Sequence, residues 1–219
     1  AVDRGLDLSL WLAPGHELEQ VRGGRLGVDV AGSGFAFIAY DLLARRGIRA
    51  EEYEIVGLGS TPGRVAALVE GRCEVTILNA GNELRAGAAG ATRVGSVSEI
   101  GPYLGTVLAT RAAPGVALEL AVSRLREVLL ATAREIVNGV GVTELVSDAE
   151  SLLGLDPDQA RRHVESLAQS STGFVTDGLV DRGSIETLVA LRSEHRPTPE
   201  LALVGPGLGD LVDGDYLSD

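Results

Sequence analysis

Apolar and polar positions predict a strand, a glycine turn and a helix in direct succession near the N-terminus. Residues 26–30 form a short apolar run, and the small residues 31–34 follow it as a turn. Phe35, Ile38 and Leu42 then recur at helical spacing, i, i+3 and i+7. Because such a helix begins with unpaired backbone N–H groups and the positive end of its dipole, the turn is a candidate anion site.

A second unit repeats this plan. Residues 53–58 are expected to form a strand, residues 62–70 a helix and residues 73–78 a third strand. Thr61 is the expected N-cap of that helix, with Pro62 at its first position. Short connections of this kind predict parallel strands and right-handed crossovers, so the turns should meet at the sheet edge where open α/β sheets bind ligands.

Further strands and helices are expected on both sides of this core. An alternating strand should cover residues 6–13, and residues 79–82 should form a polar turn. Two more strands are expected, over 91–97 and 104–110. The remainder is mostly helical, with helices expected over 117–137, 144–153, 157–168 and 182–195 and a loop over 205–219.

Composition removes several classes of function. The 219 residues suit one medium domain or two small lobes, and a net charge of −12 argues against nucleic acid or anionic membrane as a partner. No run is long enough for a membrane span. All nineteen basic residues are arginines, which excludes a Walker A lysine, a Schiff base and a Ser-Lys dyad. Cys73 is alone, so we expect neither an intrachain disulfide nor a cysteine metal cluster.

Motifs for catalysis or cofactor binding fail on inspection. The G-x-G-x-x-G pattern that begins at Gly32 has Phe37 where a glycine is required, and the one that begins at Gly57 fails at Pro62. Ser33 lacks the flanking glycines of a hydrolase nucleophile elbow. The histidines show no metal-ligand spacing: His16, His163 and His195. We therefore predict no catalytic residue, no metal site and no cofactor.

Several segments nevertheless resemble one family. Residues 24–35, Gly-Arg-Leu-Gly-Val-Asp-Val-Ala-Gly-Ser-Gly-Phe, resemble the turn that opens the second lobe of type II solute-binding proteins. The branch is the one that serves ABC importers of nitrate, sulfonates and thiamine precursors. Residues 59–79, 105–111 and 181–192 resemble later segments of that family. The resemblance covers most of residues 20–195, and its motifs are loose patterns without a catalytic signature.

The resemblance implies an α/β fold of the type II periplasmic-binding-protein kind, with two lobes of parallel-rich sheets flanked by helices. Family members carry a further βαβ segment before the equivalent of Leu6, so the N-terminal lobe is expected to be incomplete. The expected division is 1–22 for a remnant of the first lobe, 23–110 for the ligand-binding second lobe with its βαβαβ core, 111–172 for a helical continuation with the hinge, and 173–219 for the return to the first lobe and the tail.

The same resemblance implies a solute-binding component of an ABC importer. It would be a monomer outside the cytoplasm that binds a small organic or anionic molecule, presents it to a permease and catalyses no reaction; its export signal would not lie within this chain. Two alternatives stay open. One is an enzyme on the same fold, related to thiamine-precursor synthases or desulfinases, and the other is a cytosolic ligand-sensing domain.

Six residues are carried over as ligand contacts: Ser33, Gly34, Phe35, Ser60, Thr61 and Asn79. The backbone N–H groups of the first three and the Ser33 hydroxyl would be donors. The second turn would add two hydroxyls, and Asn79 a side-chain amide. Five of the six also have a structural alternative: a plain turn for Ser33 and Gly34, an N-cap for Thr61, a turn residue for Asn79 and a core residue for Phe35.

Other conspicuous side chains favour structural roles. Arg64, in a first helical turn, is expected to be solvated or salt-bridged, although an anion partner would also explain it. Cys73 should be a small buried hydrophobe, and Trp11 should lie in the core or at a lobe interface. His163 is expected on a helix surface and His195 against a helix dipole.

Overall fold

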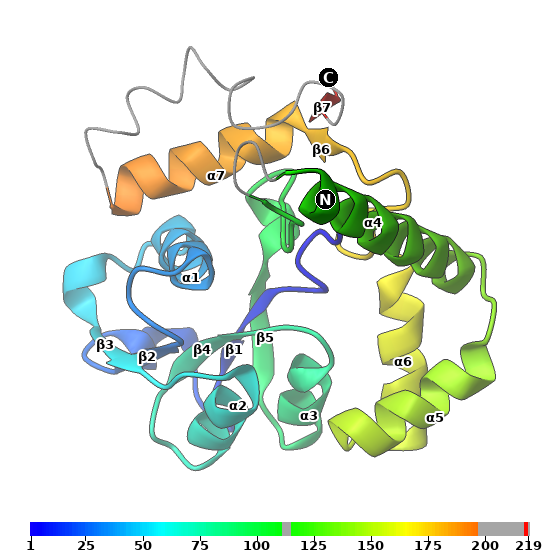
Figure 1. Cartoon of the computed structure of the whole chain (residues 1–219). Helices are drawn as coiled ribbons and strands as arrows, with labels where there is room; N and C mark the ends of the chain where they lie inside the picture. The colour runs from blue at the N-terminus through cyan, green and yellow to red at the C-terminus, as the bar shows by residue number, and fades with distance from the viewer. Residues whose placement is uncertain (111–114, 197–216, 219) are drawn as a thin grey trace.

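A five-stranded mixed sheet lies at the centre of the α/β part of the computed structural model, which describes residues 1–110, 115–196 and 217–218 (Figure 1). The strands lie in the order β3-β2-β4-β1-β5. Their bounds are β1 Ser9–Leu12, β2 Arg25–Val28, β3 Glu54–Gly57, β4 Val75–Leu78 and β5 Thr92–Ser96. β2 pairs in parallel with β3 and β4, as predicted, whereas β1 is antiparallel to both β4 and β5.

This topology gathers the strand ends that matter for binding. Because β1 runs opposite to its two neighbours, β5 runs in the same direction as β2, β3 and β4. The carboxyl ends of these four strands and the start of β1 therefore share one edge of the sheet. β1 falls within residues 1–22, expected in a remnant of the first lobe, yet it is an internal strand of the sheet built by residues 25–96.

Helices cover both faces of the sheet and extend beside it (Figure 1). They are α1 Gly34–Arg45, α2 Thr61–Val69, α3 Asn82–Ala88, α4 Val116–Val137, α5 Val142–Leu153, α6 Pro157–Leu167 and α7 Arg182–His195. Three short 3₁₀ helices cover Leu18–Val21, Ala50–Glu52 and Val97–Glu99, and β6 Val180–Asp181 pairs in parallel with β7 Leu217–Ser218. Among the described helices, none combines the length and apolarity needed to cross a bilayer.

Two apolar clusters hold these layers together. On one face, Leu26 and Ile77 of the sheet pack with Ile38 and Leu42 of α1. On the other face, a second cluster joins the end of β4 to α2 and α3, and it contains Cys73, which is fully buried as predicted. Trp11 lies half-buried against that second cluster, so the core alternative holds for it.

Helix α7 belongs with the sheet rather than apart from it. It packs against α1, and its Leu191 is buried in the same apolar cluster as the sheet. This helix lies in the segment 173–219 that was expected on the return to the first lobe. Helices α4, α5 and α6 lie together beside the sheet (Figure 1), and α4 carries several exposed apolar side chains.

Several predicted elements differ from the structure. Residues 104–110 form no strand: Thr106 makes only an isolated bridge with Asp3, and Gly105 packs directly on the Gly5 backbone. Helix α3 begins where a turn was expected, and its N-cap Gly81 has a φ of +85° and no capping side chain. Helix α2 begins one residue early, because Ser60 rather than Thr61 is its N-cap. Residues 217–218, expected in the C-terminal loop, form β7 instead because they pair with β6. Residues 111–114 and the rest of that expected loop lie outside the described residues.

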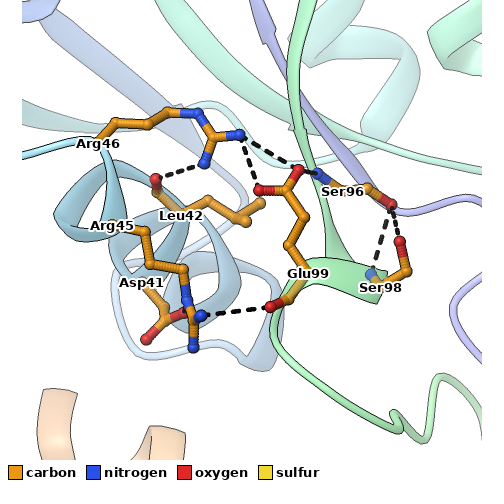
Figure 2. A network of polar contacts seen from close by, with 7 residues as sticks. All are labelled: Asp41, Leu42, Arg45, Arg46, Ser96, Ser98 and Glu99. Carbon is orange, nitrogen blue, oxygen red and sulfur yellow. Dashed lines mark hydrogen bonds and ion pairs between the residues drawn. The ribbon is translucent and has the colours of Figure 1, made fainter.

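A polar network ties the segment after β5 to α1 (Figure 2). Arg46 Nη2 donates to the Glu99 carboxylate at 2.9 Å, and the same carboxylate accepts the Ser96 N–H at 2.8 Å. Arg45 donates both to the Glu99 carbonyl, at 3.2 Å, and to the Asp41 carboxylate, at 2.5 Å. The chain leaving the sheet is thus fixed beside the edge where the strands end.

Candidate functional site

All six residues predicted to contact a ligand lie at the carboxyl edge of the sheet. They occupy the turns after β2, β3 and β4 and the first turns of α1 and α2. Gly34 and Ser60 are exposed, whereas Phe35, Thr61 and Asn79 are half-buried. The sequence therefore places these residues correctly; their contact with a ligand stays a prediction.

The first turn presents backbone donors rather than a free hydroxyl. Ser33 is the N-cap of α1: its Oγ accepts the Ala36 N–H at 3.0 Å and donates to Asp29 Oδ1 at 2.5 Å. The Ser33 hydroxyl thus donates to Asp29 in this structure, and its expected role as a ligand donor stays a prediction. Among the described residues, the N–H groups of Gly34 and Phe35 find no acceptor, so they remain open donors at the helix start.

Replacing Ser33 with alanine should lower the free energy of unfolding by about 1 kcal/mol, because the variant loses the cap of a 12-residue helix and a bond to a carboxylate. Urea unfolding followed by circular dichroism would measure this change. Ser60→Ala is the matched control, since that cap is long, at 3.4 Å. A cost for Ser60→Ala equal to that of Ser33→Ala would contradict this account of the turn.

Arg64 links β4 to the turn between β3 and α2. Its side chain is 1% exposed, so the expectation of a solvated or salt-bridged arginine is wrong. Nε donates to the Ile77 carbonyl at 3.0 Å, Nη1 to the Gly59 carbonyl at 2.6 Å and Nη2 to Thr61 Oγ1 at 3.0 Å. The guanidinium also lies 5.9 Å from the ring centre of Phe35. Burial lowers the pKa of Arg64, and the Asp29 charge counteracts that shift.

Asn79 forms a hydrogen bond with the segment that precedes β1. Its amide donates to the Gly5 carbonyl at 3.2 Å, and its own carbonyl accepts a bond from the Asn82 amide at 3.1 Å. The next residue, Ala80, donates its N–H to Leu6 at 3.0 Å. The turn alternative for Asn79 therefore has direct support in the structure.

Sequence reasoning missed three side chains at this edge. Asp29 directly follows β2. Burial raises the pKa of Tyr103 to about 12, and the charges of Asp3 and then Asp29 add smaller contributions. The Tyr103 hydroxyl lies beside Gly34, where an added Cβ would be 3.6 Å from it. The Arg196 guanidinium fills the space that a side chain at Gly32 would need. Only Asp29 had a local signal, as a charged residue directly after a buried strand.

A separate hollow of about 380 Å³ lies between the β1–β5 side of the sheet and α6. It is lined by charged and hydroxyl side chains: Asp7, Arg93, Ser96, Ser98, Arg162, Glu165, Ser166, Gln169, Ser171 and Thr172. Arg93 and Asp7 form an ion pair there at 3.0 Å. None of the six predicted residues lines this hollow.

Buried polar atoms accompany this side of the edge. Glu83 is 2% exposed and His163 is 8% exposed, so the expectation of a helix-surface histidine is wrong. Glu83 Oε1 accepts the Gly81 N–H at 3.1 Å, and the His163 ring packs against Gly81. Glu83 Oε2 and His163 Nδ1 have no hydrogen-bond partner among the described residues.

Many solved structures resemble this chain, three of them as follows. The alkanesulfonate-binding protein SsuA from Xanthomonas axonopodis pv. citri, bound to MOPS, has a TM-score of 0.68 and 14% identity, over 94% of this chain and 71% of its own. A protein from Bordetella bronchiseptica RB50 has a TM-score of 0.67 and 16% identity, over 100% and 70%. The periplasmic aliphatic sulphonate binding protein SsuA from Escherichia coli has a TM-score of 0.59 and 12% identity, over 92% and 61%.

No protein-family model and no curated protein sequence matches this chain significantly. At identities of 12–16%, the structural likeness shows the fold. The predicted fold class is confirmed: the chain has the α/β fold of type II periplasmic solute-binding proteins, with a mixed sheet flanked by helices.

Proposed function

We propose that this chain is the solute-binding component of an ABC-type importer, acts outside the cytoplasm and delivers a small organic or anionic solute to a permease. The observation that carries the proposal is the carboxyl edge of the sheet, where four strand ends meet and α1 presents two open N–H donors. Two sulfonate-binding proteins share the fold, which supports a role in binding rather than catalysis.

The charges at the edge favour a ligand with two kinds of polar group. The N–H groups of Gly34 and Phe35, with the Arg196 guanidinium against the neighbouring turn, suit an anionic group such as a sulfonate or carboxylate. The Asp29 carboxylate lies in the same turn and would repel a second anion. The proposed ligand therefore carries one anionic group and at least one N–H or O–H donor that can reach Asp29.

Binding would proceed by hinge closure without any bond being made or broken. The segments before β1 and after β5 run side by side: Val2 donates its N–H to Thr106 at 2.8 Å, and Gly105 donates to Asp3 at 3.0 Å. This pair of segments connects the sheet with the part of the chain that holds α4, α5 and α6, so it is the candidate hinge.

A thermal-shift screen of sulfonates, carboxylates, nitrate and pyrimidines tests the proposal. A ligand at 100 times its dissociation constant stabilises the folded chain by about 2.7 kcal/mol, which should raise the melting temperature by about 5–10 °C. Recovery of the ligand unchanged would distinguish binding from the enzyme alternative. A panel without any hit would contradict the importer proposal.

The site itself is tested by Gly34→Pro, with Gly34→Ala as its matched control. Proline removes one open N–H at the first position of α1, where it is compatible with the helix and with the extended Ser33 before it. Alanine keeps the N–H and adds a Cβ at ordinary contact distance from Tyr103. We expect the proline variant to bind the ligand about tenfold more weakly and the alanine variant to bind as wild type does. Equal affinities would place the ligand elsewhere.

A further inference from the structure

We propose that Asp41, Glu194 and His195 form a binding site for a divalent transition-metal ion, with Zn²⁺ as the best match, at the junction of α1 and α7. Each residue offers one ligand atom, and the three atoms lie within 4.8 Å of one another. Sequence spacing gave no sign of this site, because Asp41 is far from the adjacent pair Glu194 and His195 along the chain. The packing of α7 on α1 brings them together.

The geometry suits a small ion. Three atoms separated by no more than 4.8 Å share a point that lies within about 2.8 Å of each, whereas Zn²⁺ binds imidazole nitrogen and carboxylate oxygen at about 2.0–2.2 Å. Small rotations of the half-buried His195 and the exposed Glu194 would close that difference. Imidazole nitrogen and carboxylate oxygen are both zinc ligands, and three protein ligands leave a fourth position for water.

His195 provides an independent observation. Its Nε2 is buried and has no hydrogen-bond partner among the described residues. The ring is held between aromatic neighbours: it stacks on Phe37 at a centroid distance of 6.2 Å and meets the Tyr40 ring edge-on at 5.6 Å. A buried nitrogen without a partner destabilises the fold. An ion bound to His195 Nε2 would give this buried nitrogen a partner and remove the destabilisation.

The second carboxylate oxygen of Asp41 is available. Arg45 occupies Oδ2 at 2.5 Å, but Oδ1 accepts no hydrogen bond from any described residue (Figure 2). Glu194 adds a second carboxylate to the cluster, and each carboxylate attracts a cation. The ion would connect α1 to the last turn of α7. Arg196, which follows that turn, lies at the carboxyl edge of the sheet.

Isothermal titration of the EDTA-treated full chain with ZnCl₂ tests the site. We expect one ion per chain, with at least about tenfold weaker binding for His195→Ala and for Glu194→Gln. His16→Ala, a loop histidine that contacts the Pro14 carbonyl, is the control and should bind zinc as wild type does.

Folding and binding are separated by a second measurement. Glu194 is exposed, so Glu194→Gln should keep the wild-type circular dichroism spectrum while it loses affinity. Co²⁺ bound to the wild type should show visible absorption bands that this variant reduces. Wild-type zinc affinity in both His195→Ala and Glu194→Gln would overturn the proposal. So would the absence of saturable binding by the wild type up to about 100 µM free Zn²⁺.

Discussion

Replacing Arg64 with alanine is expected to lower the free energy of unfolding by about 4 kcal/mol. The guanidinium makes three hydrogen bonds and is 1% exposed, so alanine leaves the Ile77 and Gly59 carbonyls without their donors and opens a cavity behind α2. Bonds from a charged donor contribute about 1.5–3 kcal/mol each, and the cavity adds to the loss. The effect should thus exceed that of any single cap.

Urea unfolding with two further variants separates the causes. Arg64→Lys keeps the charge but has only one nitrogen, which cannot reach three acceptors in three directions, so its cost should fall between those of wild type and alanine. Arg124→Ala on exposed α4 should change stability by less than about 0.5 kcal/mol. If Arg64→Ala lowered the free energy of unfolding by less than about 1 kcal/mol, the contribution of one ordinary hydrogen bond, Arg64 would not hold the turns together.

The sheet could be predicted from the sequence because its signals are local. Short apolar runs bounded by glycine turns mark β2, β3 and β4, and Asp156 with Pro157 marks the start of α6. Parallel strands align their carboxyl ends, so the turn residues Ser33, Ser60 and Asn79 had to share one edge once the strands were recognised. This reasoning places the candidate site without any knowledge of side-chain contacts.

What failed depends on contacts between distant residues. Arg64 is buried because carbonyls from two other segments accept hydrogen bonds from its guanidinium. His163 is buried because its ring packs against Gly81, beside Leu155. Nothing local to either residue indicates burial. Helix α3 was missed for a different reason, because its N-cap Gly81 supplies no capping side chain. Arg196 reaches Gly32 only through the packing of α7 on α1.

The stability of this protein is expected to fall as pH rises from about 4.5 to about 7, in part because of Glu83. Burial raises the pKa of this carboxyl from 4.5 to about 7, with a further contribution from Asp7 and opposition from Arg93. Between these two pH values the folded state holds a proton that the unfolded state has lost. Its stabilising contribution is therefore full below pH 4.5 and is lost as pH rises through the folded pKa.

Replacing Glu83 with glutamine should remove this dependence. The amide keeps the oxygen that accepts the Gly81 N–H, but it carries no charge that must be buried. At pH 8 the variant should be more stable than wild type by about 3 kcal/mol, whereas at pH 4.5 the two should be nearly equal. Urea unfolding at a series of pH values between 4.5 and 8 measures both limits.

Comparison with wild type separates Glu83 from the other buried group of this edge. Burial lowers the pKa of His163, so that residue costs stability as pH falls below 6.5 and opposes the Glu83 slope in both proteins. The difference between the two pH profiles cancels this contribution and leaves that of Glu83. The exposed Glu127→Gln on α4 should give a profile parallel to wild type. If the pH profile of Glu83→Gln also ran parallel to that of wild type, Glu83 would be ionised in the folded state across this pH range. That result would contradict the proposed effect of its burial.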